Sequence, residues 1–278
     1  MINYNENYIN KSDSDLLNRG FLYGDSVFES IRIVNNKIIF WEDHYMRLMS
    51  SMRIIRIEIP QSYTPDFFKL QITNTISKVN SSFTGRVRLT IFREGGGYYT
   101  PELSSPSFIV NCSVIDSKEF FLKDSEFKVD LFKDYYIQND LLSNLKTNNK
   151  LINVLAGIYA NENNLDNCIL LNNKKNVTEF LNGNLFIVRG NKIITPNLDS
   201  GCLKGIMRKK IIEYVKLLPE FSIEETVISP FDLLSANEIW LTNSISGIIN
   251  VTNYRNKSFS NDIAKIFIDF LNKKVSNI

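Results

Sequence analysis

The sequence has few of the residues on which many catalytic and metal sites depend. It contains one histidine, His44, and three cysteines, Cys112, Cys168 and Cys202. A Ser-His-Asp or Cys-His mechanism would therefore have to use His44. The cysteines are odd in number and show no CxxC spacing, so they predict neither a disulfide framework nor a zinc site, and we expect no metal. Unpaired cysteines are typical of a reducing compartment, which favours the cytoplasm.

The chain also lacks a long hydrophobic run and an excess of charge of either sign. No apolar segment approaches the roughly 20 residues that a membrane helix requires, and residues 1–15 are too polar for a secretory signal. The 32 basic and 30 acidic residues leave a formal charge of +2, which gives no reason to expect nucleic acid as a partner. With 278 residues and 44% hydrophobic positions, we expect a soluble globular protein that acts on a small molecule.

Hydrophobic periodicity in the first half predicts a sheet with helices on it. The expected elements are two strands between residues 27 and 40 around Asn35-Asn36, helices from Glu42 and over 65–79, and strands over 86–92 and 107–114. Residues 116–140 are charged and aromatic without helical periodicity, which is typical of a crossover between domains. We therefore predict an α/β fold with an N-terminal domain at 1–118 and a C-terminal domain at 119–278.

The second half is predicted to alternate short strands with helices. Leu151, Val154, Leu155 and Ile158 have the i, i+3, i+4, i+7 spacing of one helix face, so we expect a helix after Lys146. Strands are expected over 168–171, 177–179, 185–188, 192–195 and 238–242. Further helices are expected from Gly205, after Ser229-Pro230, and over 263–271.

Three places in this half combine a functional group with an unusual setting. Lys146 lies between an apolar approach and a helix start, where burial would lower the pKa of its amine and make it nucleophilic. Glu179 is a carboxylate at the end of a strand. The loop 201–207 precedes a helix and resembles an anion cradle, with the amides of Ile206 and Met207 directed at a phosphate. Each feature alone is more often an ordinary surface or loop residue, but together they are the groups that pyridoxal phosphate requires.

Six segments carry a likeness to a known family. In chain order they are RGFLYGDSVFESIR (19–32), EDHYMRL (42–48), LKTNNKLINVLA (145–156), VTEFLNGNLFIV (177–188), LKGIMRKKI (203–211) and EIWLTNSISGIINV (238–251). With these segments the chain resembles the class IV aminotransferase family, the fold type IV pyridoxal-phosphate enzymes. That family includes branched-chain and D-amino-acid aminotransferases and 4-amino-4-deoxychorismate lyase. The resemblance implies a smaller N-terminal α/β domain, a larger C-terminal domain with a barrel-like sheet, pyridoxal 5'-phosphate between them, and a homodimer.

The resemblance also implies roles for individual residues. Lys146 matches the lysine that binds the cofactor covalently, with Lys150 as its nearest competitor, and Glu179 matches the glutamate that pairs with the pyridinium nitrogen. Arg47, in an HxxRL pattern, matches the arginine that holds the cofactor phosphate, and its planar guanidinium suits that role. His44, one helical turn earlier, is expected at the edge of the site.

Further residues are assigned by the same resemblance. The amides of Ile206 and Met207 and the hydroxyl of Ser244 are the other expected phosphate contacts, and Tyr23, Phe28, Arg32 and Arg93 are the expected substrate contacts. Lys150 stands where branched-chain enzymes carry tyrosine, so the partner of the cofactor O3' is unassigned.

Two activities within the family remain open. The segments WLTNSISGII, RVRL and GIMR favour 4-amino-4-deoxychorismate lyase, which forms 4-aminobenzoate and pyruvate in folate biosynthesis. The segment YGDSVFESIR is very like that of branched-chain enzymes and keeps an amino-acid aminotransferase as the alternative. A binding protein without catalysis would be expected to have lost Lys146 or Glu179, and both are present.

Overall fold

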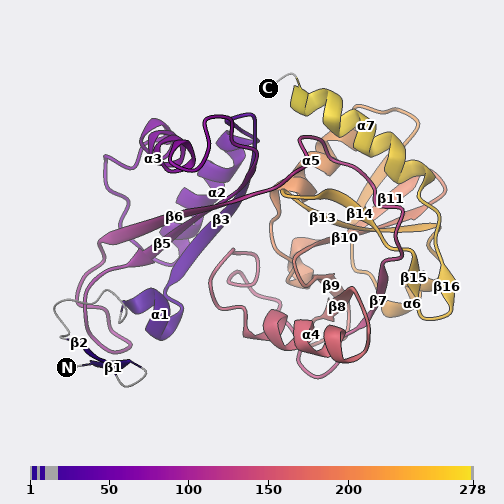
Figure 1. Cartoon of the computed structure of the whole chain (residues 1–278). Coiled ribbons are helices and arrows are strands. Elements are labelled where there is room, and N and C mark those ends of the chain that lie inside the picture. Colours follow the sequence, from indigo (N-terminus) through magenta and orange to yellow (C-terminus); the bar gives the residue numbers. More distant parts are fainter. Residues whose placement is uncertain (1, 5–6, 10–17, 277–278) are drawn as a thin grey trace.

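The computed structural model describes residues 2–4, 7–9 and 18–276, so most of the polar segment that argued against a secretory signal lies outside the described residues. Two halves lie side by side (Figure 1). The N-terminal half contains a four-stranded sheet and the C-terminal half a ten-stranded sheet. A small hairpin of β1 (Ile2–Tyr4) and β2 (Asn7–Ile9) precedes them. The predicted mixed α/β fold is confirmed.

The N-terminal sheet has the antiparallel order β4-β3-β5-β6. Its strands are β3 (Ser26–Val34), β4 (Lys37–Ile38), β5 (Gly85–Arg93) and β6 (Pro106–Val114). Its helices are α1 (Arg19–Tyr23), α2 (Trp41–Ile54) and α3 (Pro65–Ser77). The expected strands and the two longer helices are confirmed within a few residues.

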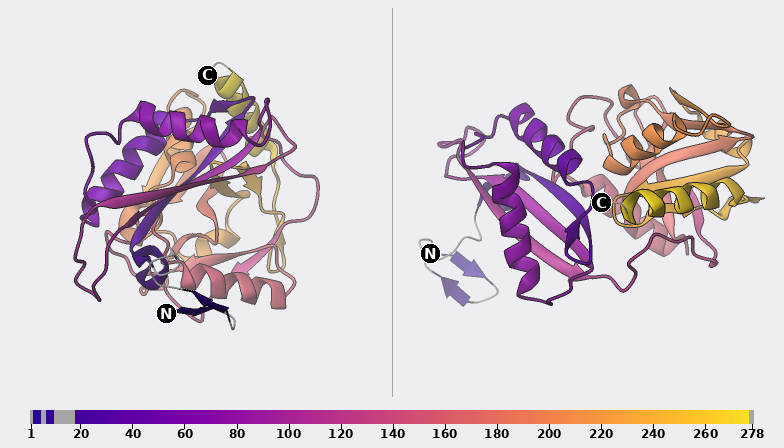
Figure 2. Two further views of the ribbon diagram at one scale, coloured as in Figure 1. Left: turned by 60° about the vertical axis from the view of Figure 1, so that its left-hand side comes forward. Right: turned by 90° about the horizontal axis from the view of Figure 1, so that it is seen from above.

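The two faces of this sheet have different roles. The face that carries Val27, Ile31 and Leu89 packs against α2 and α3 and forms the core of this half. The opposite face carries Ser30 and Arg88, which lie directly across from each other in the β3-β5 pairing. Because side chains alternate along a strand, Ser30, Arg86 and Arg88 share this second face, which is turned toward the C-terminal half (Figure 2), whereas Glu29 lies on the first face.

The C-terminal sheet is mixed and branched, because β10 pairs with β9, β11 and β13. Its strands are β7 (Lys128–Leu131), β8 (Asn167–Leu171), β9 (Val177–Phe180), β10 (Gly183–Arg189), β11 (Lys192–Pro196), β12 (Ser222–Thr226), β13 (Glu238–Asn243), β14 (Gly247–Asn250), β15 (Asn253–Tyr254) and β16 (Lys257–Ser258). Its helices are α4 (Leu151–Glu162), α5 (Ile206–Val215), α6 (Pro230–Leu234) and α7 (Asp262–Ser276). The sequence patterns did not predict β7, β12 or β14 to β16.

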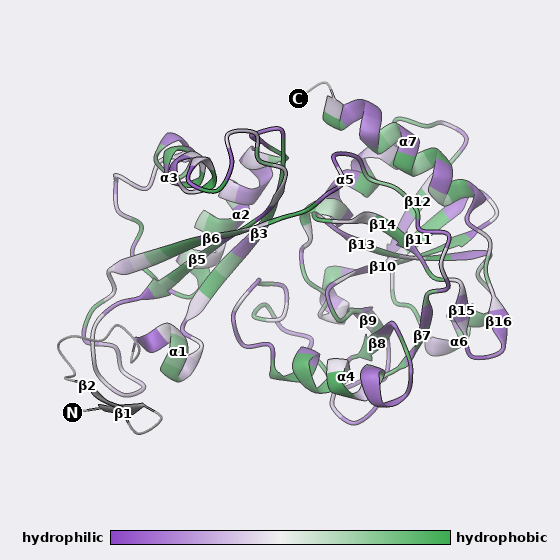
Figure 3. Ribbon diagram, in the orientation of Figure 1, coloured by the Kyte–Doolittle hydropathy of each residue, from purple (hydrophilic) through white to green (hydrophobic). Residues whose placement is uncertain are grey.

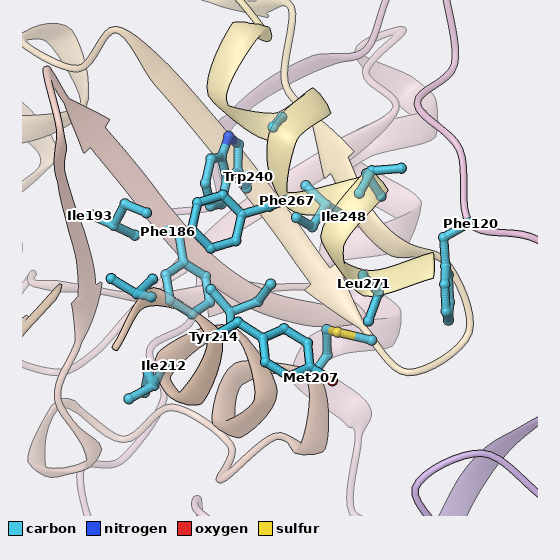
Figure 4. Close-up of a cluster of buried hydrophobic side chains, with 14 of the residues drawn as sticks. Phe120, Phe186, Ile193, Met207, Ile212, Tyr214, Trp240, Ile248, Phe267 and Leu271 are labelled. Atoms are coloured by element: carbon cyan, nitrogen blue, oxygen red, sulfur yellow. The ribbon is translucent and has the colours of Figure 1, made fainter. Parts of the chain in front are cut away.

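Both faces of β10 and β13 are buried. Phe186 and Trp240 pack beneath α5 and α7 with Phe267 and Met207 (Figure 4), while Leu185 belongs to a second core on the opposite face. Packing of this kind fixes the start of α5, where Met207 lies. The core therefore holds one wall of the candidate site in place.

Helix α4 forms where the apolar spacing predicts it, but its apolar face is not buried. Leu151, Val154 and Ile158 are 71%, 56% and 50% exposed, whereas the small residues Ala156 and Ala160 pack against β8. Apolar residues extend over much of this helix (Figure 3). Ile152, Leu155 and Tyr159 pack partly against the same core, so Leu151, Val154 and Ile158 lie on the opposite, exposed side of the helix.

The chain crosses from β6 to β7 through residues 115–127 (Figure 2). Phe120, in this connection, exchanges two hydrogen bonds with the Asn272 side chain on α7. The expected boundary at residue 118 falls within it, and the division into independent domains stays a prediction. No helix within the described ranges is long and apolar enough to cross a membrane, and no group of three or more His, Cys, Asp or Glu side chains there is arranged to hold a metal.

Candidate active site

A cavity of about 370 Å³ is lined by both halves of the molecule. Most of the residues expected from the sequence line it: Phe28, Arg47, Lys146, Glu179, Ile206, Met207 and Ser244. These residues come from β3, α2, the segment before α4, β9, the start of α5 and the β13-β14 loop. Folding therefore brings an amine, a carboxylate, a guanidinium and a helix N-terminus to one place.

Lys146 is held against β3 by a short antiparallel backbone pairing. The Phe28 amide donates to the Lys146 carbonyl at 2.9 Å, and the Asn148 amide donates to the Ser26 carbonyl at 3.2 Å. The Nζ atom of Lys146 lies 4.5 Å from the centroid of the Phe28 ring. Burial, and next the positive charge of Arg47, lower the pKa of Lys146 from 10.5 to about 7. Much of this amine is therefore in its nucleophilic, uncharged form near neutral pH.

Glu179 is buried at the end of β9. Its Oε2 atom accepts a hydrogen bond of 2.8 Å from the Leu203 amide, and among the described residues this is the carboxylate's only hydrogen bond. Burial raises the pKa of Glu179, although Lys150, the Leu203 amide and Lys146 act in the opposite direction. The Leu203 amide fixes the orientation of the carboxylate and leaves its second oxygen for a partner in the cavity.

The N-terminus of α5 opens onto the same cavity. Gly205 is the N-cap residue, and the amides of Ile206 and Met207 follow it in the first turn, where a helix has no internal acceptor for them. A Cβ atom at Gly205 would lie 1.9 Å from Oδ1 of Asn184, whose amide nitrogen donates to the Leu203 carbonyl at 2.8 Å. A larger residue here would displace the Asn184 side chain, and the lack of a side chain at Gly205 leaves the helix end open to an anion.

Arg47 lies beside this helix end. Its Nη1 atom donates to the Lys204 carbonyl at 3.1 Å, and its Nε atom donates to Oε1 of Glu29 at 2.8 Å, with a second bond from Nη2 to Oε2. Thr242, which also lines the cavity, has a buried hydroxyl without a hydrogen-bond partner in the described part of the chain. These donors, with Ser244 in the adjoining loop, are chemically suited to a phosphate.

The sequence patterns did not identify Glu29, Arg86 or Arg88 as site residues. Glu29 is 1% exposed and lies among apolar residues of β3. A carboxylate within an otherwise apolar strand face is the sequence signal that could have identified it. Arg86 and Arg88 line the cavity from β5, where they alternate with the buried residues Val87 and Leu89. No ion pair of either arginine with a carboxylate occurs among the described residues.

Three expected substrate contacts lie elsewhere. Tyr23 and Arg93 line a larger cavity of about 1040 Å³, which shares Lys150 and Glu179 with the first. Arg93 donates to Asp25 and to two carbonyls at the end of α2, so much of its hydrogen-bonding capacity holds the N-terminal half together. Its role toward a substrate carboxylate stays a prediction.

Arg32 differs most from the expectation, because it lines neither cavity. Its guanidinium is 4.4 Å from the Phe120 ring centroid and donates to the carbonyls of Ile245, Ser117 and Glu119. The expected contact of Arg32 with a substrate therefore stays a prediction. Arg32 instead ties β3 to the connection between β6 and β7 and to the loop that follows Ser244.

Comparison with known proteins identifies the family of this chain. A family model described as amino-transferase class IV matches residues 26–254. An aminodeoxychorismate lyase from Vibrio harveyi is 24% identical over 236 residues, 84% of this chain and 84% of that protein. A putative branched-chain-amino-acid aminotransferase from Methanocaldococcus jannaschii is 28% identical over 251 residues, 89% of this chain and 85% of that protein.

A solved structure shows the same fold. The crystal structure of an aminotransferase from Brucella abortus bound to the cofactor PLP matches with a TM-score of 0.81 and 19% identity, over 93% of this chain and 92% of that chain. The family match covers most of the sequence, and the predicted family is confirmed. The chain belongs to the class IV aminotransferase family of enzymes.

Proposed function

We propose that this enzyme uses pyridoxal 5'-phosphate and converts 4-amino-4-deoxychorismate to 4-aminobenzoate and pyruvate. The observation that carries the proposal is a single cavity in which the Lys146 amine, the Glu179 carboxylate and the phosphate donors meet two further cationic side chains, Arg86 and Arg88. The amine, the carboxylate and the phosphate donors suit the cofactor. The arginines suit an anionic substrate.

The residues present fit the cofactor at each of its ends. Arg47, the amides of Ile206 and Met207 and the hydroxyl of Ser244 would hold its phosphate, beside the open helix end at Gly205. The buried Thr242 hydroxyl, which has no hydrogen-bond partner among the described residues, is a further donor on that side. Glu179 would accept a hydrogen bond from the pyridinium nitrogen, and Lys146 would form the covalent link.

The protein groups then divide the proton transfers. When bound, the cofactor supplies an electron sink for a carbanion on the substrate. Lys146 Nζ removes the proton from the carbon that bears the substrate nitrogen, and its lowered pKa suits a base that works near neutral pH. Loss of the enolpyruvyl ether leaves an aromatic ring, and proton delivery to enolpyruvate gives pyruvate. Glu179 stays in place through its Leu203 hydrogen bond.

Two arginines in the lining of the cavity favour a substrate with more than one carboxylate. The guanidinium carbon of Arg88 lies 3.6 Å from the centroid of the Phe28 ring, and Arg88 donates a hydrogen bond of 2.8 Å to Asn148 Oδ1. Arg86 donates a hydrogen bond of 3.1 Å to the Ser30 hydroxyl. Burial, and next the charge of Arg86, lower the pKa of Arg88. Two neighbouring cations without a carboxylate partner among the described residues form a site for anions.

The alternative activity is amino transfer to a 2-oxo acid. It is supported by the likeness to the putative branched-chain aminotransferase, and the same lysine and glutamate would serve it. The cavity has apolar lining as well, from Phe28, Leu181 and Ile206 among others, but Arg86 and Arg88, which pair with no carboxylate in the described part of the chain, suit a substrate with more than the single carboxylate of an amino acid. We therefore rank the lyase first.

The enzyme is further proposed to act as a homodimer in the cytoplasm. The exposed apolar side chains of Leu151, Val154 and Ile158 on α4 form a face that a second copy would bury. Size-exclusion chromatography with light scattering tests this assembly. A monomer with full activity would contradict it.

Product analysis without an added oxo acid tests the proposed reaction. A lyase returns the cofactor to its starting form in each turnover, whereas an aminotransferase stops after one half-reaction without a 2-oxo acid. The purified enzyme is expected to release 4-aminobenzoate and pyruvate over many turnovers. Failure to do so, with sustained amino transfer from leucine or D-alanine to 2-oxoglutarate, would assign the aminotransferase instead.

A further inference from the structure

Glu29 is an acidic side chain buried in the apolar face of β3. It is 1% exposed, on the side of the sheet that packs against α2. An ionised carboxylate is costly to bury unless it is paired. Glu29 is paired three times, through Nε and Nη2 of Arg47 and through Nδ1 of His44 at 2.7 Å.

The charges of this cluster follow from its burial and its contacts. Burial alone would raise the pKa of Glu29, but the charge of Arg47 and the hydrogen bonds from His44 and Arg47 outweigh it and hold the pKa at about 2. Burial lowers the pKa of His44, although Glu29 favours its charged form. Glu29 is therefore an anion that accepts, and a neutral His44 donates its Nδ1 proton to it.

The cluster constrains the one guanidinium at the phosphate end of the cavity. His44 and Arg47 lie three residues apart on α2, so both reach the same carboxylate from one helix face. A guanidinium has five N–H donors. Glu29 and the Lys204 carbonyl take three of them, and two remain for an anion in the cavity that Arg47 lines.

We propose that Glu29, supported by His44, is a positioning residue that orients Arg47 toward the cofactor phosphate. The inference rests on the proposed cofactor role of Arg47. Two effects of Glu29 oppose each other, because its negative charge also weakens the long-range attraction of Arg47 for a phosphate. Orientation dominates, since an arginine side chain freed from this bidentate contact gains rotamer freedom that phosphate binding would have to remove.

The test compares the cofactor with pyridoxal, which lacks the phosphate. Apoprotein variants are titrated with each compound, and the ratio of the two affinities isolates the phosphate contacts. Glu29→Gln is expected to weaken binding of pyridoxal 5'-phosphate about 10-fold, the loss of one charged hydrogen bond, while pyridoxal binding changes less than about twofold. Glu29→Asp, which keeps the charge but withdraws it from Arg47, is expected to show the same selective loss even if Glu29→Gln does not fold.

A second buried glutamate provides the matched control. Glu238 accepts hydrogen bonds from Trp240 Nε1 and from the amides of Ile263 and Ala264, at the start of α7. Glu238→Gln removes a comparable buried charge, so it is expected to lower thermal stability and leave the affinity ratio unchanged. A changed ratio in this control would show that the readout reports general destabilisation and would overturn the inference.

A double variant separates this inference from the proposed function. When Glu29→Gln is combined with Arg47→Ala, the selective loss of affinity for pyridoxal 5'-phosphate is expected to grow by less than about twofold over Arg47→Ala alone. Glu29 acts by orienting Arg47, so it has little further effect once that arginine is absent. Equal losses for both compounds, or wild-type binding by both Glu29 variants, would overturn the positioning role. If Arg47→Ala itself shows no phosphate-selective loss, the proposed phosphate site fails as well.

Discussion

The lowered pKa of Lys146 makes the stability of the cofactor-free protein depend on pH. Its pKa is about 7 in the folded chain, against an ordinary value of 10.5. Between these values the unfolded chain binds more protons than the folded one, so the free energy of unfolding rises with pH in this window. Burial of the Lys146 amine therefore lowers the free energy of unfolding at pH 7, and this effect disappears above pH 10.5.

The size of the effect follows from the two pKa values. Each pKa unit corresponds to about 1.4 kcal/mol, and the full difference of 3.5 corresponds to about 5 kcal/mol. Between pH 7 and pH 9 the linkage relation gives a gain of about 2 kcal/mol. Lys146→Met, which has no amine, should lack this gain.

Urea unfolding of the apoprotein at pH 7, 8 and 9 measures the effect. Wild type is expected to gain about 2 kcal/mol relative to Lys146→Met over this range. Arg47→Gln removes a positive charge that lowers the pKa of Lys146, so its gain should be smaller. A constant difference between wild type and Lys146→Met would show that the amine is not buried as described.

Further predictions concern the cofactor anchors and the exposed helix. Arg47→Ala should weaken cofactor affinity by about 1.5 to 3 kcal/mol in equilibrium titration, whereas Glu179→Gln should chiefly lower turnover in steady-state kinetics. Equal effects on both quantities would contradict this division of roles. Gly205→Ala should also weaken cofactor binding, because its Cβ would lie 1.9 Å from Asn184 Oδ1; calorimetry showing wild-type affinity would remove the helix end from the phosphate site. Leu151→Glu should yield monomers in light scattering, and an unchanged dimer would exclude α4 from the interface.

Several regular elements were predictable because their patterns are local. The alternation of β5 and the Thr64-Pro65 start of α3 are each contained in a few neighbouring residues. Short strands such as β15, two residues long, carry too little pattern to detect. Besides its neighbour β16, β15 pairs with β7, which lies more than a hundred residues away along the chain.

The positions of the side chains were less predictable than the helices and strands that carry them. Lys146, Glu179 and Arg47 were assigned through family likeness, and the structure brings them to one cavity. Arg32 was assigned through the same likeness but reaches the connection after β6, because carbonyls there accept its hydrogen bonds. For α4, the apolar spacing that begins at Leu151 predicted the helix. It did not predict which side of the helix is exposed, since that depends on which elements pack against it.

Borohydride reduction of the purified holoenzyme, followed by peptide mapping, tests the central claim that Lys146 binds pyridoxal 5'-phosphate in this cavity. The account predicts one reduced pyridoxyl adduct, on Lys146, and no adduct in Lys146→Met. An adduct on Lys150, or no adduct on wild type that contains the cofactor, would contradict it.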